Sequence, residues 1–492
     1  MARLKEYNGH YCESEYEYAF IGFLEAEGWK YSSGNNIHRV TKRDILIVDD
    51  FKKFIADTNP DLTEEEVTQI YDNVRLVGAE SDFATLHKVY GWMVNGVQFT
   101  PQDGLPRMIP LIDFDNLDKN IFRVVNQFTV EYTNNGQKEN RRPDVLLFVN
   151  GMPLCVIELK NPADANATIY DAWEQINIRY WRDIPHLLHY CPLACISDGV
   201  KTRLGTVRTP YEHFYAWRRV NDGDAVSTLP FEETETMIKG RFIAPERSSW
   251  SGFSVDYIYF QDSIYDSDEV EIVCRYPQFF AARLLKQSII NSVVQKSGKG
   301  GTYFGATGCG KTYTMAFLAR QLALRCTDIP EIGSPTIILI VDRDELQKQG
   351  AKLFTKSKEF LNLGEVAVVK NRAQLRQELG ARQSGGFYIC TIQKFCDRED
   401  DKIGLINDRQ NIICFSDEAH RTQLEHSKKI QFSKDADENM KAMVSKPYAK
   451  VLKEAFPQAT FVGFTGTPIA ETYQTFGDEL IDIPWIRQLQ TD

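Results

Sequence analysis

The sequence predicts an α/β protein with two α/β domains joined by a linker, and three observations support this. The 492 residues would fill about three domain-sized units at roughly 100–200 residues each. In the second half, short apolar runs alternate with helical patterns, and the first half contains a strongly apolar hairpin. We therefore expect domains at 1–245 and 271–492, with the linker at 246–270.

The composition is that of a folded, globular chain. Hydrophobic residues make up 43% and charged residues 25% of it, which excludes intrinsic disorder. No apolar run approaches the roughly 18–20 residues that a membrane span needs, and the N-terminus has no apolar signal core. The ten cysteines include no Cys-x-x-Cys pair, so we expect reduced thiols. These features predict a cytoplasmic protein with no membrane segment.

The net charge at first argues against a nucleic-acid ligand. The 57 Lys and Arg against 68 Asp and Glu give −11, and Lys and Arg make most phosphate contacts. Carboxylates that bind metal contribute to this total, and local basic surfaces decide nucleic-acid binding. The net charge is therefore a weak argument against nucleic-acid binding.

The first domain is expected to begin with an amphipathic helix at 15–31. Gly28 fits a glycine just beyond a helix end. A strand, a hairpin and a helix follow, at 120–132, 144–160 and 165–182. The loop-rich stretch after residue 221 leads into the linker.

The second domain contains short, continuous apolar strands separated by helical patterns. These strands are expected at 336–342, 387–391, 412–417 and 461–466. Such a pattern is typical of a parallel sheet covered by helices on both faces. We therefore expect a doubly wound sheet.

A phosphate-binding loop occupies residues 305–312, which match G-x-x-x-x-G-K-[ST] in full. A strand pattern precedes the loop and a helical pattern follows, as this motif requires. Its glycines let backbone N–H groups point at phosphates, and the helix N-terminus adds its dipole. Lys311 is expected to hold the β- and γ-phosphates, and Thr312 to bind Mg²⁺. The predicted nucleotide-binding residues are Gly305, Thr307, Gly308, Cys309, Gly310, Lys311 and Thr312.

Two carboxylates end the apolar strand at 412–417. Asp417 and Glu418 would lie at the carboxyl end of the sheet, where ligands of open α/β sheets bind. We expect Asp417 to bind Mg²⁺ and Glu418 to orient or deprotonate the attacking water. A polar cap on a strand end is the alternative, which the preceding phosphate loop weakens.

A second candidate site lies in the hairpin at 144–160. Glu158 and Lys160, two apart on one strand, share a face. Burying such charges is costly unless they are paired or bind metal. Asp144 and Glu158 as Mg²⁺ ligands, with Lys160 positioning the nucleophile or offsetting charge, would suit phosphodiester hydrolysis. A salt-bridged strand pair is the alternative.

The register of this hairpin decides whether Asp144 joins the other two charges. A two-residue loop would put Asp144 and Glu158 on opposite faces. A three-residue loop, 149–151, with Gly151 left-handed in a bulge, would pair position 144 with 156 and gather all three charges. We predict the odd-length or bulged hairpin, because only it brings the charges together without a strand bend.

These motifs resemble those of two protein families. Pro143-Asp144 followed by Glu158-x-Lys160 resembles the PD-(D/E)xK nuclease signature. The sequence at 417–420, Asp-Glu-Ala-His, resembles the DEAH box of superfamily 2 helicases and translocases. That resemblance extends to motif III at 464–468, and it implies that His420, Thr465 and Thr467 couple the ATP site to DNA. It also extends to the adenine-reading Q motif, and it implies that Arg275 and Gln278 contact the adenine.

From about 10 to 475, the order of these segments resembles the restriction (motor) subunit of Type I restriction-modification enzymes. The resemblance implies a PD-(D/E)xK nuclease domain, with a mixed central sheet flanked by helices, followed by one RecA-like lobe. It implies ATP and Mg²⁺ as cofactors, and ATP-driven translocation of double-stranded DNA with Mg²⁺-dependent cleavage. It also implies partner subunits for methylation (modification) and specificity.

The resemblance suggests two supporting residues for the nuclease site. Glu17 matches a helix glutamate that often completes such sites; Glu15 competes with it, and a solvated helix face is the alternative for both. Gln175 matches the first residue of the family's Gln-x-x-x-Tyr pattern and is expected to contact DNA or the site. Tyr180 lies one residue too far along, which on an α-helix turns it by about 100° and leaves its role open.

The resemblance ends near residue 470. We therefore expect the second RecA-like lobe to be absent from this chain, which would be the N-terminal piece of a longer subunit. That lobe brings an arginine worth about 10³–10⁵ in rate, so ATP binding is expected to be weak and hydrolysis slow or absent.

Two other functions stay open. One is a free-standing helicase–nuclease of DNA repair or phage defence, which would keep its activity without methyltransferase partners. The other is a remodeller-like ATPase whose first domain only binds DNA or protein. Retained restriction by Asp144→Ala or Lys160→Ala would favour that binding module.

Overall fold

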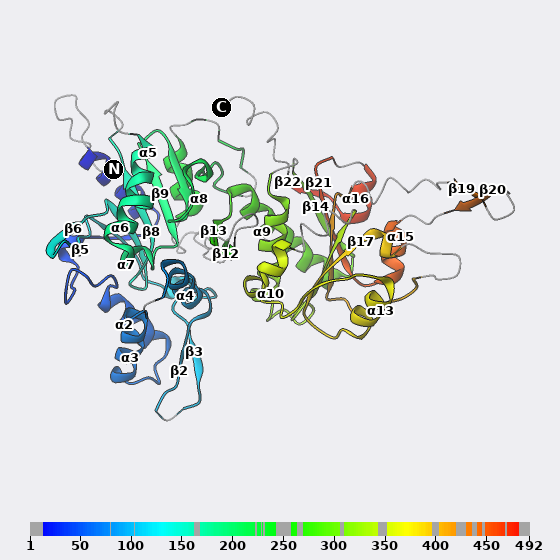
Figure 1. Cartoon of the computed structure of the whole chain (residues 1–492), viewed down its shortest axis with the longest axis horizontal. Helices are drawn as coiled ribbons and strands as arrows, with labels where there is room; N and C mark the ends of the chain where they lie inside the picture. The colour runs from blue at the N-terminus through cyan, green and yellow to red at the C-terminus, as the bar shows by residue number, and fades with distance from the viewer. Residues whose placement is uncertain are drawn as a thin grey trace. The chain divides into compact units, whose positions relative to one another are not determined.

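A computed structural model of the chain divides into two compact units (Figure 1). Residues 1–260 and 269–273 form the first, and residues 261–268 and 274–492 form the second. The structure describes residues 13–78, 80–102, 104–161, 168–221, 224–227, 229, 232–242, 257–262, 269–305, 309–342, 352–395, 403–419, 430–434, 440–444, 448–467 and 470–481.

A mixed seven-stranded sheet forms the centre of the first unit, in the spatial order β1-β4-β7-β8-β9-β10-β11. The pairs β1–β4 and β8–β9 are parallel, and the other neighbours are antiparallel. Every residue of β7, β8 and β9 is buried, which explains their continuous apolar sequences. The strands are β1 (Lys30–Ser33), β4 (Phe122–Asn126), β7 (Val145–Val149), β8 (Met152–Leu159), β9 (Leu193–Ser197), β10 (Thr202–Gly205) and β11 (Tyr215–Ala216).

Helices flank this sheet, as the fold prediction requires. They are α1 (Glu13–Ala26), α5 (Ile169–Glu174), a π-helix η3 (Gln175–Tyr180), α6 (Trp181–Asp183), α7 (Pro185–Leu188) and α8 (Glu233–Arg241). Between β1 and β4 the chain adds α2 (Val48–Thr58), α3 (Glu64–Arg75), α4 (Asp82–Asn95) and the hairpin β2 (Val97–Phe99) and β3 (Arg107–Ile109). Short 3₁₀ turns lie at η1 (Gly34–Asn36), η2 (Leu117–Lys119) and η4 (Tyr211–His213).

Three predicted elements of this unit differ from the structure. The first helix ends at Ala26 rather than at 31, because β1 already begins at Lys30. Gly28 has the left-handed φ of +100° that is expected just after a helix. The predicted strand at 120–132 is split into β4 and β5 (Val130–Asn134), because β5 leaves the main sheet to pair with β6 (Gln137–Arg141). The predicted helix at 165–182 is described only from residue 168 and changes to π-helical geometry.

The expected linker at 246–270 lies largely outside the described residues. Its described part includes β12 (Ile258–Asp262), which pairs with β13 (Glu269–Val273) in a two-stranded sheet. The Phe260 ring packs edge-on against Phe83 of the first unit, with ring centroids 5.3 Å apart. The exact domain limits stay a prediction.

The second unit is a parallel, doubly wound sheet, which confirms the predicted fold class. Its seven strands lie in the order β16-β17-β15-β18-β21-β14-β22, and all neighbours are parallel. The strands are β14 (Lys299–Phe304), β15 (Thr336–Val341), β16 (Val366–Val368), β17 (Phe387–Thr391), β18 (Ile412–Asp417), β21 (Thr460–Thr465) and β22 (Glu479–Ile481).

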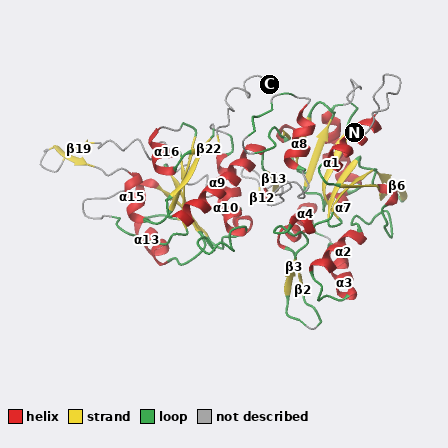
Figure 2. Cartoon of the chain, turned by 180° about the vertical axis from the view of Figure 1, so that it is seen from behind, coloured by secondary structure: helices red, strands yellow, loops and turns green. Residues whose placement is uncertain are grey.

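Helices cover both faces of this sheet (Figure 2). On one face, Ile338 and Ile340 of β15 pack in a buried cluster with Leu375 of α13 and Val451 of α15. Figure 1 shows α9 and α10 on the opposite side. The helices are α9 (Tyr276–Gln295), α10 (Lys311–Leu324), α12 (Lys358–Leu361), α13 (Arg372–Ala381), the 3₁₀ turn η8 (Ile392–Phe395), α15 (Tyr448–Ala455) and α16 (Ala470–Phe476). A separate hairpin is formed by β19 (Ile430–Lys434) and β20 (Met440–Val444).

Candidate active sites

The loop of the β7–β8 hairpin has two residues, so the predicted three-residue loop is wrong. Asn150 and Gly151 have φ values of +49° and +78°, and Val149 pairs with Met152 across them. Positive φ at both central residues defines a type I′ turn, which matches the twist of antiparallel strands and favours Asn-Gly.

A β-bulge inside β8 nevertheless brings the carboxylates to one face. Phe148 pairs with Pro153, whereas Leu147 pairs with Cys155, so Leu154 has no partner of its own across the hairpin. The bulge shifts the register by one residue and places position 144 opposite position 158. The predicted bulged hairpin is therefore confirmed, with the extra residue in the strand rather than in the loop.

Hydrogen bonds from main-chain N–H groups to the two carboxylates join the segments that carry Asp144 and Glu158. The Leu159 N–H donates to Asp144 Oδ2 at 2.9 Å, and the Asp144 N–H lies 3.4 Å from Glu158 Oε1. Glu158 is fully buried, whereas Asp144, just before β7, is half-buried. The pair therefore presents one enclosed carboxylate and one accessible carboxylate.

The surroundings of Glu158 disfavour its ionised form. Burial and the negative charge of Asp144 raise the Glu158 pKa well above its ordinary value, and the positive charge of Lys160 and a hydrogen bond from Tyr180 oppose this. The Tyr180 O–H donates to Glu158 Oε1 at 2.6 Å. A cation between the two carboxylates would remove the repulsion that holds this proton.

The Gln175 side chain connects the acidic and basic groups of this site. Its Nε2 donates to Glu158 Oε2 at 2.6 Å, and its Oε1 accepts a hydrogen bond from Lys160 Nζ at 3.0 Å. The Lys160 N–H donates to the Ser197 carbonyl at 2.8 Å, which ties the end of β8 to β9. The structure therefore gathers Asp144, Glu158, Lys160 and Gln175.

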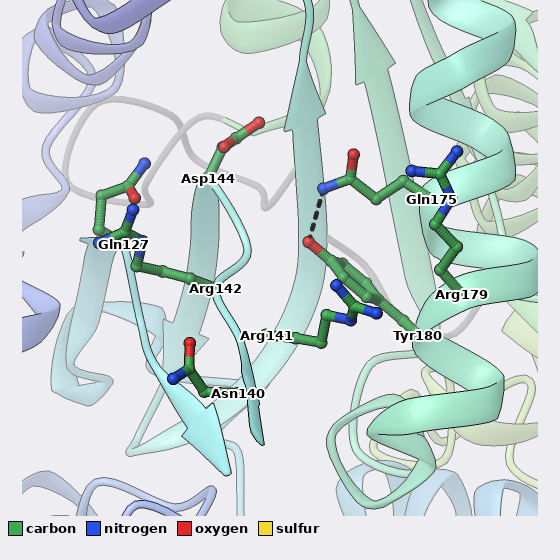
Figure 3. Close-up of a pocket in the computed structure, with 8 residues that line it drawn as sticks. All are labelled: Gln127, Asn140, Arg141, Arg142, Asp144, Gln175, Arg179 and Tyr180. Carbon is green, nitrogen blue, oxygen red and sulfur yellow. Dashed lines mark hydrogen bonds between the residues drawn. The ribbon is translucent and has the colours of Figure 1, made fainter. Parts of the chain in front are cut away.

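Tyr180, whose role the sequence left open, also reaches the site. Residues 175–180 form a π-helix rather than an α-helix. Because π-helical hydrogen bonds span five residues, the inserted residue leaves Gln175 and Tyr180 on one side. Gln175 Nε2 donates to the Tyr180 hydroxyl at 2.9 Å, the dashed line in Figure 3.

Glu17 is buried beside the site but does not join the two carboxylates. Its oxygens accept hydrogen bonds from Asn126 Nδ2 at 2.6 Å and from Gln127 Nε2 at 2.5 Å, whereas Glu15 is half-buried. Among the described residues, no group of three or more His, Cys, Asp or Glu could hold a metal ion. Mg²⁺ is commonly held by one or two carboxylates together with waters and phosphates, so Asp144 and Glu158 fit it.

Gln127 is a site residue that the sequence did not reveal. Its φ is +53°, an uncommon conformation for glutamine that is often found at functional sites. Its N–H donates to the Asp144 carbonyl at 3.0 Å, and its side chain binds Glu17. Gln127 therefore connects α1 to the segment before β7, and no local pattern in the sequence could have predicted this.

A polar pocket of about 410 Å³ opens beside Asp144 (Figure 3). Its lining residues come from the residue after β4, from β6, from the segment on either side of Pro143 and from the π-helix. They are Gln127, Asn140, Arg141, Arg142, Asp144, Gln175, Arg179 and Tyr180.

The predicted phosphate loop lies between β14 and α10. Gly310 has a φ of +84° and precedes the first turn of α10. Lys311 Nζ donates to the Gly305 carbonyl at 3.2 Å and lies 3.8 Å from Glu418 Oε1. Cys309 and Thr312 are half-buried, whereas the predicted Thr307, Gly308 and His420 lie outside the described residues.

Gln278 joins the phosphate loop to the start of α9. Its Nε2 donates to the Gly310 carbonyl at 3.3 Å, and its Oε1 accepts from the Arg275 N–H at 2.9 Å. The φ of Gly310 favours glycine, and a Cβ there would displace the Gln278 amide. Burial lowers the Arg275 pKa to about 10.

Asp417 and Glu418 end β18 next to this loop. Burial and the charge of Glu418 raise the Asp417 pKa to about 6, and Lys311 opposes the shift. Glu418 has a φ of +50°, and its N–H donates to Asp417 Oδ1 at 3.0 Å. This turn leaves the Glu418 carboxylate beside Lys311.

Thr465, at the end of β21, connects this strand to the phosphate loop. Its carbonyl accepts the Gly305 N–H at 3.0 Å, and its Oγ1 accepts the Thr467 N–H at 3.1 Å. Gln393 Nε2 donates to the Asp342 carbonyl at 2.7 Å, which joins the ends of β15 and β17. Because the carboxyl ends of parallel strands share one edge, distant motifs meet there.

Two family models match this chain, one in each half. The family model described as Type I restriction enzyme R protein N terminus matches residues 11–213, and the SWI2/SNF2 ATPase model matches residues 277–492. The Type I restriction enzyme HindI endonuclease subunit of Haemophilus influenzae is 30% identical over 490 residues, 94% of this chain and 44% of that protein. The chain belongs to the R-protein family of Type I restriction enzymes.

A second relative of this R-protein chain comes from Methanocaldococcus jannaschii, where its provisional name is type I restriction enzyme MjaIXP endonuclease subunit. It is 30% identical over 502 residues, 95% of this chain and 44% of that protein. The R-protein chain thus spans less than half the length of these relatives. In the described part of the R protein, no helix is long and apolar enough to cross a membrane.

Proposed function

We propose that the first unit of this R-protein chain is a Mg²⁺-dependent DNA endonuclease and that the second is the first ATP-binding lobe of a DNA translocase. The substrate is double-stranded DNA, and the partners are the modification and specificity subunits of the same restriction enzyme. The convergence of Asp144, Glu158 and Lys160 beside the polar pocket carries the nuclease proposal.

In this proposal, Asp144 and Glu158 hold Mg²⁺, and Glu17 supports the site from α1 through Gln127. When bound, the metal lowers the pKa of a water and offsets charge on the phosphoryl oxygens. Gln175 and Tyr180 orient the Glu158 carboxylate, and Gln175 also orients the Lys160 ammonium group. Lys160 then positions the nucleophile or offsets negative charge at the phosphate.

For the second unit, we propose that Lys311 exchanges its contact with the Gly305 carbonyl for the β- and γ-phosphates of ATP. Thr312 and Asp417 hold the accompanying Mg²⁺, and Glu418 orients the attacking water. Arg275 and Gln278 contact the adenine beside the phosphate loop. Thr465 and Thr467, and with them His420, couple this site to DNA.

The nuclease assignment is tested in the full-length, assembled enzyme. Asp144→Asn and Glu158→Gln are expected to lower DNA cleavage by about 10² or more, while ATP hydrolysis and translocation continue. Asp57→Asn, a change at an exposed carboxylate on α2 that pairs with Lys53, is the control and should cleave normally. Normal cleavage by Asp144→Asn would refute the assignment.

A further inference from the structure

We propose that the pocket beside Asp144 binds the phosphate backbone of the DNA strand and that Arg142 is the positioning residue that contacts a phosphate next to the one cut. This inference rests on the nuclease function proposed above. Three arginines line the pocket, and none belongs to the motif residues already assigned. They are Arg141, Arg142 and Arg179.

The arginines surround Asp144 from different elements. In Figure 3, Arg142 lies on the Gln127 side of Asp144, and Arg179 lies on the Gln175 side. Arg141 ends β6, whereas Arg179 belongs to the π-helix. A ligand in this pocket would therefore meet guanidinium groups on both sides of the proposed metal-binding carboxylate.

Only one of the three arginines is without a protein partner in the described part of the chain. Arg141 binds Asp183, with its NH2 2.6 Å from Oδ2, and Arg179 NH2 lies 3.0 Å from Glu174. Arg142 is exposed, and no hydrogen bond or ion pair to it is found among the described residues. A partnerless guanidinium in a pocket of like charges is well placed to bind an anion.

The local charge also favours an anionic ligand, although the whole chain carries −11. The four cations that line the pocket or contact its lining are Arg141, Arg142, Arg179 and Lys160, and the four carboxyl groups are Asp144, Glu158, Glu174 and Asp183. The two sets of charges balance, so a divalent metal held by Asp144 and Glu158 would leave a net positive charge at the pocket. A phosphodiester supplies the matching negative charge.

The spread of arginines around the pocket favours a nucleic-acid backbone over a single small anion. The planar fork of an arginine matches two phosphate oxygens. The amides of Gln127 and Asn140 add neutral donors and acceptors around the same pocket. A continuous strand offers a phosphate on each side of the one cut, so Arg142 and Arg179 could each meet one while Asp144 faces the bond that breaks.

The test measures binding of a short duplex to this 492-residue chain, with Ca²⁺ in place of Mg²⁺, across a range of salt concentrations. Arg142→Gln is expected to weaken binding about ten-fold or more at low salt and to reduce the salt slope by about one. Arg142→Lys should restore the slope and part of the affinity, because it keeps the charge but not the fork.

Arg182→Gln is the matched control. It removes the same charge two residues beyond Tyr180, from a side chain that pairs with Asp183 and does not line the pocket. Its salt slope should not change. An equal loss in Arg142→Gln and Arg182→Gln, or an unchanged slope in Arg142→Gln, overturns the inference.

Cleavage by the assembled enzyme separates this inference from the nuclease proposal. If Asp144→Asn abolishes cleavage but Arg142→Gln leaves both KM and binding unchanged, the nuclease stands and the Arg142 contact is refuted. If Asp144→Asn cleaves normally, the nuclease proposal itself fails. A raised KM with a nearly unchanged kcat in Arg142→Gln supports the positioning role.

Discussion

Glu158 shows how one buried carboxyl group links pH, metal binding and stability. Its pKa is raised by burial and by Asp144, so the folded state retains a proton above the usual glutamate pKa of about 4.3. The metal-free fold therefore loses stability as the pH rises from that value to the raised pKa. A metal that binds the carboxylate form displaces the proton, so the metal affinity rises with pH over the same window.

This linkage predicts that divalent metal binds more weakly at pH 6 than at pH 8, with proton release on binding. Calorimetric titration of Mn²⁺ in two buffers of different ionisation enthalpy measures both quantities. Glu158→Gln should lose the proton release. Glu233→Gln is the control, because Glu233 is another buried carboxyl with a raised pKa but lies outside the site. Equal affinity at both pH values would contradict the prediction.

The Tyr180 hydroxyl offers a second prediction for a single residue. Tyr180→Phe removes the donor to Glu158 Oε1 and should lower the free energy of unfolding by about 1–3 kcal/mol. The loss of this bond also raises the Glu158 pKa further, so the acid limb of the pH–cleavage profile should move to higher pH.

Tyr190→Phe is the matched control for Tyr180→Phe. It removes a buried hydroxyl that donates to the Val74 main-chain carbonyl at 2.7 Å rather than to a carboxylate. It should lower stability, as measured by denaturant unfolding, but leave the pH profile in place. A shift of the profile in both variants would refute the specific role of Tyr180.

Among the secondary-structure elements, the β7–β8 hairpin depends on a glycine that no other residue can replace. Gly151 has a φ of +78°, and a Cβ there would clash with the Ile47 carbonyl oxygen. Gly136, in the β5–β6 turn, has a φ of +81° but nothing within 4 Å of such a Cβ. Comparing substitutions at the two positions therefore distinguishes the cost of backbone strain from the cost of a steric clash.

We expect Gly151→Ala to lower the free energy of unfolding by about 3 kcal/mol or more, and Gly136→Ala by about 1–2 kcal/mol. Only the first variant combines left-handed strain with a backbone clash. Denaturant unfolding of both proteins measures the difference. Equal losses would show that the contact with Ile47 is unimportant.

The π-helix makes a prediction about chain length rather than side chains. Deleting Ile178, which is 48% exposed, should convert residues 175–180 to an α-helix that keeps Gln175 and Tyr180 on one face. We therefore expect the deletion to keep metal binding and DNA cleavage. Inserting an alanine after Ile178 should abolish both, because neither helix type then aligns the two residues. Cleavage by the insertion variant would contradict this account.

At the scale of the whole molecule, two compact units carry two separate sites. Lys311→Ala removes the cation at the phosphate loop and should weaken nucleotide binding at least about ten-fold, without changing metal binding at Asp144. Asp144→Asn should do the reverse. Titrations of this chain with a fluorescent ATP analogue and with Mn²⁺ measure both effects. A change in Mn²⁺ affinity in Lys311→Ala would contradict the independence of the sites.

The amino-acid sequence by itself determined the fold class and pointed to the residues proposed for both sites. Both sites leave a local pattern in the sequence. One is a charged residue inside an apolar strand, as at Glu158, because a buried charge is tolerated only where it is paired or binds metal. The other is the glycine-rich loop before Lys311, because phosphate binding needs glycines at fixed positions. The order of the motifs also predicted a parallel sheet that brings Asp417 to the phosphate loop, and the structure has that sheet.

Only the tertiary structure decided how these residues meet. The bulge at Leu154 and the π-helix before Tyr180 each shift a register by one residue. Gln127 adopts a left-handed conformation that no local pattern indicates. A shifted and an unshifted register differ little in local free energy. Packing against distant strands and helices, here around Glu158, therefore decides which register forms.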